Sequence, residues 1–156
     1  MNFILNFILM LSALMLFSCH PAHADTPEWI THVTKGNIKL TEAIKISKSI
    51  YAYSFKYNID PNVLFKIAKV ESNFNRKARS SHNAKGLFQI ITRYHLDKIK
   101  GRNIYNVDVN ADVAAQIYKE YLSLYKTPNR ALRAYNGSHR SNQYPLKIAA
   151  VKLSHY

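Results

Sequence analysis

An apolar helical stripe that ends in a carboxylate is the feature of this sequence that most constrains its fold. The spacing i, i+3, i+4 and i+7 of one helical face is shared by Leu64, Ile67, Ala68 and Glu71. The Asp60–Pro61 pair before them predicts where the helix begins, since Asp is a good N-cap and Pro suits the first turn. A buried helix with an acid at its end is therefore expected here.

Helical patterns recur along the chain, and no segment alternates apolar and polar residues as a strand would. A polar loop over 73–83 separates the Glu71 helix from the next. The further helices predicted are Thr41–Asn58 with Ile44, Ile50 and Phe55 on its apolar face, Gly86–Ile91, a helix capped by Asn110 and reaching Leu124, Arg130–Tyr135, and one started by Pro145 and reaching Val151. The sequence thus predicts an all-α domain of about six helices around one core.

Glu71 is the candidate for acid–base chemistry. A carboxylate on an apolar helical face loses hydration, which disfavours its charged form and raises its pKa. A raised carboxyl pKa suits a general acid near neutral pH. The alternative from periodicity alone is a Glu whose stem packs while its head reaches solvent or a Lys.

Other chemistries find little support in the sequence. There is no HExxH, no His pair at ligand spacing and one Cys, so neither a metal site nor a disulfide framework is expected. Four Gly leave little material for phosphate loops, and no cofactor is expected. Serines such as Ser72 lack the local signature of a nucleophile.

The charge balance points to an anionic partner. There are 22 Lys and Arg against 9 Asp and Glu, a formal net charge of +13. These basic residues are spread almost evenly from Lys35 to Lys152, without the patch or stripe of a nucleic-acid site. Attraction to a polyanion without base reading fits this distribution better than nucleic-acid binding.

Residues 1–24 have the anatomy of a secretory signal peptide. They carry no charged side chain, have an apolar centre from Phe7 to Phe17 and end in Ala22-His23-Ala24. No Lys or Arg precedes the apolar run, which leaves a buried helix or an uncleaved anchor as alternatives. The run is short for a stable membrane span. The expected organisation is a signal at 1–24 and one domain at 25–156, exported to the periplasm.

Cys19 gives a second possibility for the leader. Leu16-Phe17-Ser18-Cys19 loosely resembles the lipobox of bacterial lipoproteins. Phe17 is bulky for the middle position of that motif, which favours cleavage after Ala24 over lipidation at Cys19.

Three blocks in the chain resemble a known family. Ala68–Asn75 is similar to the Glu-Ser signature of the SLT-type, goose-lysozyme-like lytic transglycosylase domain. Ala84–Ile90 resembles its Gly-Leu-Met-Gln block, and Ala134–Gly137 resembles its Ala-Tyr-Asn-Ala-Gly block. The blocks are in the family's order, over about residues 43–150. The resemblance implies a lysozyme-like fold and makes Glu71 the favoured catalytic residue.

The resemblance also implies an activity. Members cut the β-1,4 bond between N-acetylmuramic acid (MurNAc) and N-acetylglucosamine (GlcNAc) in peptidoglycan and leave a 1,6-anhydromuramyl end. One carboxylate suffices because the substrate supplies its own nucleophile, whereas most glycosidases need two. Small exported members serve secretion, conjugation or pilus machines, so peptidoglycan strands and such an apparatus are the implied partners.

The family's substrate-binding positions carry over to six residues. By resemblance these are Ser80, Gly86, Phe88, Gln89, Tyr135 and Asn136. Ser80 and Gln89 would bind near the acid and the sugar acetamides, and Tyr135 and Asn136 would hold Glu71 or the sugar. Gly86 would act through its backbone because a side chain there would crowd the glycan. For Phe88 and Tyr135 plain packing is the alternative.

Departures from the family pattern keep other functions open. Gly137-Ser138 follows Asn136 where the family has Ala-Gly, and Phe88 replaces the usual Met. A hydrolysing lysozyme of the same fold is one alternative, against which the missing second carboxylate argues. A non-catalytic, cationic wall-binding or assembly protein is the other.

Overall fold

The computed structural model describes residues 27–138 and 140–153, and within them the chain is mostly helical. The helices are α2 (Pro27–Val33), α3 (Leu40–Tyr57), α4 (Pro61–Ser72), the 3-10 turn η1 (Thr92–Tyr94), α5 (Leu96–Ile99), α6 (Val107–Tyr125), α7 (Pro128–Tyr135) and α8 (Gln143–Ala150). A two-stranded sheet pairs β1 (Ala84–Lys85) with β2 (Ile90–Ile91). The predicted all-α class is confirmed. The predicted signal segment 1–24, with Cys19, lies outside the described residues.

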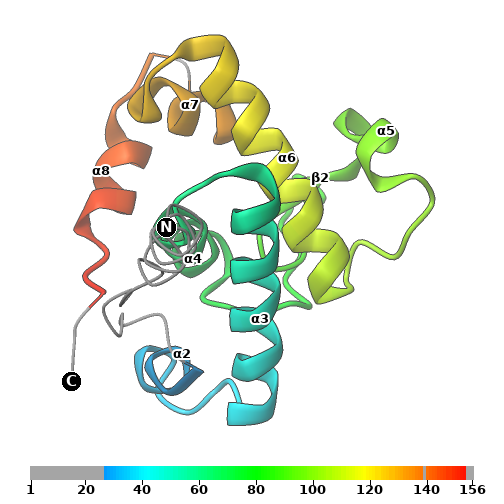
Figure 1. Cartoon of the computed structure of the whole chain (residues 1–156), viewed down its shortest axis with the longest axis vertical. Coiled ribbons are helices and arrows are strands. Elements are labelled where there is room, and N and C mark those ends of the chain that lie inside the picture. The colour runs from blue at the N-terminus through cyan, green and yellow to red at the C-terminus, as the bar shows by residue number, and fades with distance from the viewer. Residues whose placement is uncertain (1–26, 139, 154–156) are drawn as a thin grey trace, which may run out of the picture.

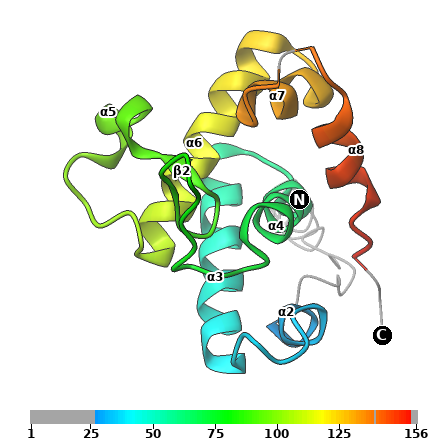
Figure 2. The same ribbon diagram turned by 180° about the vertical axis from the view of Figure 1, so that it is seen from behind.

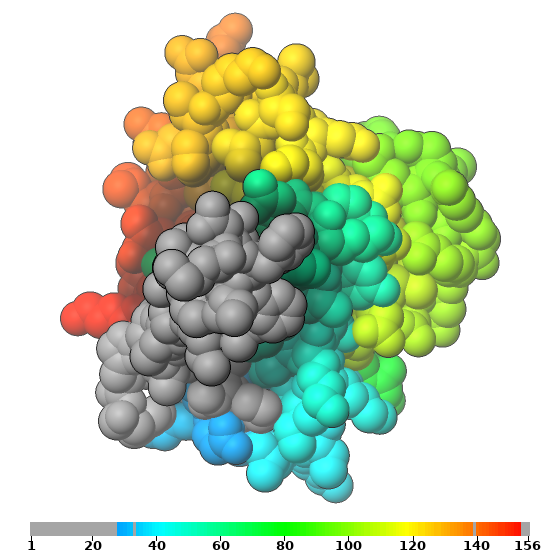
Figure 3. Space-filling view, in the orientation of Figure 1, coloured from blue at the N-terminus to red at the C-terminus, as the bar shows by residue number. Residues whose placement is uncertain are grey.

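The long helices pack side by side around a common core. α3 packs on α6 and on α2, while α4 lies against α3 on one side and α8 on the other (Figure 1). α7 follows α6 at a sharp corner and packs on both α6 and α8. The space-filling view shows the region of α5 projecting beside α6, away from α8 (Figure 3). None of the helices in the described part of the chain is long and apolar enough to cross a membrane.

The helix that carries Glu71 forms as its sequence predicts. The Asp60 side chain accepts a hydrogen bond from the Asn62 backbone N–H at 3.0 Å, which caps α4. Leu64, Ile67 and Ala68 are fully buried. At the other end Asn73 takes a left-handed conformation, φ 50°, which stops the helix. The stripe therefore anchors α4 in the core and leaves Glu71 in its last turn.

The expected helix over Gly86–Ile91 is wrong, because this segment is a hairpin. Gly86 has φ +78° and Gln89 has φ +49°, both left-handed values that break a helix. Leu87, Phe88 and Ile90 are nevertheless buried in the core. A buried turn and a buried helix present the same short run of apolar residues, so periodicity could not separate them.

Some expected details of other helices are also wrong. α6 is capped by Asn106, whose side chain accepts from the N–H groups of Asp108 and Val109, while Asn110 lies buried inside the helix. Phe55 is 88% exposed rather than part of the apolar face of α3. α8 begins two residues before Pro145.

Candidate active site

Glu71 meets one strong hydrogen-bond donor. The Tyr144 hydroxyl on α8 donates to Glu71 Oε1 over 2.6 Å. α4 and α8 pack against each other, so two elements far apart in sequence set this contact (Figure 1). A donor at this distance orients the carboxyl group and stabilises its charged form.

The environment of Glu71 shifts its pKa upwards. Burial is the main cause, because the protein replaces the water that would stabilise the carboxylate. The hydrogen bond from Tyr144 and the positive charge of Lys147 oppose this effect without cancelling it, so the pKa of Glu71 stays above its ordinary value. Such a group holds its proton to higher pH than a surface glutamate and can donate it.

Two tyrosines near Glu71 are held in their protonated form. Burial, followed by the negative charge of Glu71, raises the pKa of both Tyr144 and Tyr135. Tyr144 uses its proton on Glu71, and the Tyr135 hydroxyl donates to the Phe88 carbonyl at 3.1 Å. Tyr135 thereby ties the end of α7 to the hairpin 84–91.

The hairpin is also fixed from α4 and α6. Ser72, next to Glu71, donates its hydroxyl proton to the Leu87 carbonyl at 2.7 Å. Asn110 accepts from the Phe88 N–H at 2.7 Å through Oδ1, and its Nδ2 donates to the carbonyls of Ile104 at 2.9 Å and Lys85 at 3.2 Å. Asn110 is 1% exposed, so these bonds satisfy a buried amide that α6 carries to the hairpin.

One cavity contains Glu71, and a second shares a lining residue with it. The first, of about 290 Å³, is lined by Val70, Glu71, Asn136, Ser138, Ser141, Gln143, Tyr144 and Lys147. The second, of about 260 Å³, is lined by Gln89, Ile90, Ile91, Tyr94, His95, Ile117, Tyr121, Ala134, Tyr135, Asn136 and Gly137. Asn136 lines both, so the two cavities meet at the end of α7. Glu71 is the one carboxylate among these lining residues.

A larger cavity lies elsewhere. It measures about 490 Å³ and is bounded by α3, the loop after α4 and the start of α6. Its charged walls include Glu42 and Arg76, which form an ion pair at 2.8 Å. Glu71 does not line it.

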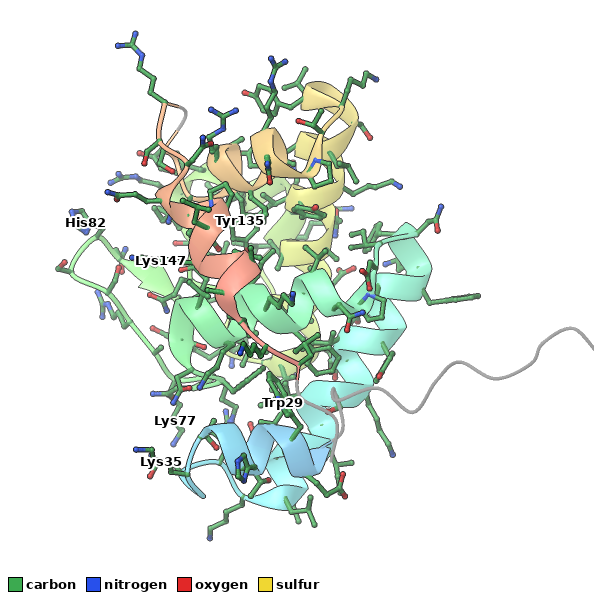
Figure 4. The ribbon with its side chains drawn as sticks, turned by 90° about the vertical axis from the view of Figure 1, so that its left-hand side faces the viewer. Trp29, Lys35, Lys77, His82, Tyr135 and Lys147 are labelled. Carbon is green, nitrogen blue, oxygen red and sulfur yellow. The ribbon has the colours of Figure 1, made fainter. Side chains whose placement is uncertain are left out.

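The structure brings together four of the predicted site residues. Glu71 and Asn136 share the first cavity, and Gln89, Tyr135 and Asn136 line the second. Figure 4 shows Tyr135 and Lys147 on the side of the molecule from which α8 is seen in front of α4. The remaining three predicted residues, Ser80, Gly86 and Phe88, line neither cavity.

These three residues serve the hairpin itself. Ser80 Oγ accepts from the Ala84 N–H at 3.1 Å. The Phe88 side chain is fully buried, and its carbonyl accepts from the Tyr135 hydroxyl. Gly86 lies against the Asn110 side chain, which leaves no room for a side chain at this position. A Cβ at Gly86 would lie 2.5 Å from Asn110 Nδ2.

Sequence reasoning missed Tyr144, Lys147 and the role of Asn110. Tyr144 directly precedes Pro145 near a helix start, a pattern that gives no sign of a partner 73 residues away. Lys147 lies one helical turn after Tyr144, and this spacing was the available signal that both face the same element. Within the ranges 27–138 and 140–153, no three His, Cys, Asp or Glu side chains cluster as metal ligands would.

A mostly helical fold that sets one desolvated carboxyl group in a cavity is consistent with a lysozyme-like domain. Residues 48–152, more than half of the chain, match the family model described as the transglycosylase SLT domain. The chain therefore belongs to the SLT-type lytic transglycosylase family, as its three sequence blocks predicted.

A curated relative supports this membership. The chain is 28% identical over 116 residues to a protein of Enterobacteria phage PRD1 named "Transglycosylase". The match covers 70% of this chain and 43% of the phage protein, so the chain spans less than half the length of that relative.

Proposed function

We propose that this chain is an exported peptidoglycan lytic transglycosylase, which cleaves the β-1,4 bond between MurNAc and GlcNAc and leaves a 1,6-anhydromuramyl end. The observation that carries the proposal is the single desolvated carboxyl group of Glu71, held by Tyr144 in a cavity with no second carboxylate among its lining residues. Family membership supports the substrate and the bond.

Glu71 performs two proton transfers in this mechanism. As a general acid it gives its proton to the glycosidic oxygen, and the bond from that oxygen to C1 of MurNAc breaks. As a base it then takes the proton of the C6 hydroxyl, while O6 bonds to C1 of the same sugar. Glu71 ends the reaction with one proton, as it began, and no water is consumed.

The neighbours of Glu71 suit this cycle. The Tyr144 hydroxyl stabilises the carboxylate that remains after the first transfer, and burial favours return of the proton. Asn136 would contact sugar on both sides of the acid because it lines both cavities. Gln89 and Tyr135 would line the adjoining sugar site, while Ser80, Gly86 and Phe88 hold the hairpin in place.

Digestion of purified sacculi tests the activity. Muropeptides released by the wild-type domain should carry the mass of the anhydro form, and Glu71→Gln should lower their yield roughly 10²–10⁴-fold. Hydrated, reducing muramyl ends would indicate the hydrolysing alternative. Binding to sacculi without any products from the folded protein would indicate the wall-binding alternative.

Export and the cellular role are part of the proposal. The uncharged segment 1–24 and its Ala22-His23-Ala24 ending support cleavage and release into the periplasm. Resemblance to small exported members supports local opening of the wall for a secretion, conjugation or pilus apparatus. Sequencing the N-terminus of the exported protein tests the first point, with Asp25 as the expected first residue.

A further inference from the structure

The cavity of the acid contains one cation. Lys147 lines it together with Glu71, and the other lining side chains are apolar, hydroxyl, amide or phenol groups. Lys147 is exposed on α8, and no salt bridge to it is found within the described residues. Its charge nevertheless acts on Glu71, whose pKa it lowers against the larger effect of burial. Lys147 is thus a positive charge close to the reacting group and open to solvent.

Polar side chains line the same cavity as this cation. Ser141 and Gln143 line the same cavity, and so does Ser138, whose buried hydroxyl has no hydrogen-bond partner within the described part of the chain. An ammonium group with hydroxyl and amide groups around it is a suitable site for an oxygen anion.

The second cavity has a different chemistry. Three tyrosines, Tyr94, Tyr121 and Tyr135, line it with aliphatic side chains and two amides, and no Lys, Arg, Asp or Glu is among its lining residues. Its one titratable nitrogen base is His95, whose pKa burial lowers, which favours the neutral imidazole. Aromatic faces suit the apolar faces of sugar rings rather than a charged substituent. The two cavities that meet at Asn136 therefore distinguish a charged part of the ligand from an uncharged one.

The substrate under the proposed function has such a charge on one of its two sugars. MurNAc carries a lactyl group at C3, which is a free carboxylate on a bare strand and the attachment point of an acidic stem peptide on an intact one. GlcNAc carries no charge. The muramyl ring must also lie at Glu71, because its C1–O bond breaks there.

We propose that Lys147 is a specificity-determining residue that binds a carboxylate carried by the muramyl residue at the scissile bond. The inference rests on the proposed function and adds how the acid's cavity tells MurNAc from GlcNAc. It places the charged substituent on the α8 side of Glu71. Its contribution is ionic at an exposed side chain, so it weakens as salt rises.

Binding measured on an inactive background tests this inference. The parent is the full mature chain with Glu71→Gln, and the ligands are chitohexaose, glycan strands stripped of peptides by an amidase, and intact glycan–peptide strands. Lys147→Met in this parent should weaken binding of the carboxylate-bearing strands roughly five- to fifty-fold. It should leave chitohexaose, which has no carboxylate, unchanged.

Matched variants control for folding and overall charge. Lys147→Arg should keep most of the affinity, and Lys45→Met, which removes a charge from α3 outside both cavities, should bind like the parent. The loss caused by Lys147→Met should shrink in 0.5 M NaCl. Loss on stripped strands alone would assign the lactyl carboxylate, and loss on intact strands alone would assign the stem peptide.

The outcomes separate the two proposals. If Lys147→Met binds every ligand as the parent does, or weakens chitohexaose equally, the role of Lys147 is overturned while the proposed function stands. If the parent itself binds none of the three ligands, the proposed function fails, and the inference fails with it.

Discussion

In the proposed mechanism Glu71 both gives and takes a proton, and its surroundings suit both steps. Burial raises its pKa, while the Tyr144 hydroxyl and the charge of Lys147 limit the rise. A carboxyl group left to burial alone would hold its proton too firmly to act first as an acid. The hydrogen bond from Tyr144 is therefore expected to matter for the rate as well as for orientation.

Tyr144→Phe isolates that hydrogen bond. Without the donor at 2.6 Å the carboxylate is less stable, so the pKa of Glu71 should rise further. The high-pH limb of kcat/KM, where the acid loses its proton, should move to higher pH, and kcat should fall roughly tenfold to a hundredfold. Turnover of sacculi across pH measures both effects.

Tyr105→Phe is the control for this variant, since Tyr105 lines neither cavity at the acid. Its pH profile should match the wild type. A Tyr144→Phe limb that moves to lower pH would contradict the role assigned to the hydrogen bond.

Glu71 should also cost the protein stability at neutral pH. Its folded pKa lies above its unfolded value, so the folded state resists ionisation and loses stability as pH rises from the unfolded to the folded pKa. Glu71→Gln removes that penalty and should raise the free energy of unfolding at pH 7. Denaturant unfolding at pH 7 and at pH 3.5 should show the gain shrinking at the lower pH; an equal gain at both would contradict this explanation.

At the scale of elements, the hairpin 84–91 is held by α6. Gly86 lies so close to the Asn110 side chain that a Cβ would overlap its amide, and its φ of +78° is left-handed. Gly101 has a similar φ of +73° but nothing within 4 Å of the same position. Alanine substitutions at Gly86 and Gly101 therefore distinguish the effect of backbone strain from the effect of overlap with Asn110.

Gly86→Ala should lower the free energy of unfolding by more than Gly101→Ala does. The control should lose about 1 kcal/mol from backbone strain alone, and overlap with Asn110 should add about 1–3 kcal/mol. Chemical denaturation of both variants measures the difference. Equal decreases in the free energy of unfolding would mean that the Asn110 side chain moves aside without cost and does not fix the hairpin.

Asp112 on α6 joins α3 and the loop after α5. This 5%-exposed carboxylate on α6 contacts Lys56 of α3 at 3.0 Å and Arg102 of the loop after α5 at 2.9 Å, and it accepts from the Tyr57 hydroxyl at 2.7 Å. Burial alone would raise the pKa of Asp112, but the hydrogen bonds from these three groups lower it below its ordinary 3.8.

Asp112→Asn should therefore destabilise the protein in a pH-dependent way. A carboxylate with a lowered folded pKa stabilises the fold above its unfolded pKa, and that contribution is lost as pH falls below about 4. At pH 7 the free energy of unfolding of the variant should be about 1–3 kcal/mol below that of the wild type. This difference between the two proteins should be smaller at pH 3. Thermal unfolding of both proteins at the two pH values measures this difference. An equal difference at both pH values would contradict an ionic contribution from Asp112.

The sequence predicted α4 well and the hairpin poorly, for the same physical reason. α4 has a cap, a starting proline and a stripe long enough to show its period, and each of these is local. The hairpin is buried by contacts from Ser72, Asn110 and Tyr135, which lie far away in sequence. Local pattern predicted Glu71, but Tyr144 and Lys147 depend on how α8 docks, and that is a tertiary property.

At the scale of the whole molecule, Glu71 lies where α4 packs against α8. α4, which follows the α2–α3 pair, supplies Glu71, and the α7–α8 corner supplies Asn136, Tyr144 and Lys147 (Figure 2). Asn136 lines both cavities, which under the proposed function would let one glycan strand contact both. Under the proposed function, the net charge of +13 would draw the protein to an anionic wall before any specific contact forms.

In the proposed mechanism Glu71 serves as acid and base while the substrate provides the nucleophile. Digestion of sacculi in water enriched in ¹⁸O tests it most directly, with mass spectrometry of the released muropeptides. We predict anhydromuramyl products without ¹⁸O at C1, and their loss in Glu71→Gln. Reducing muramyl ends that carry one ¹⁸O at C1 would show that water is the nucleophile and would contradict this mechanism.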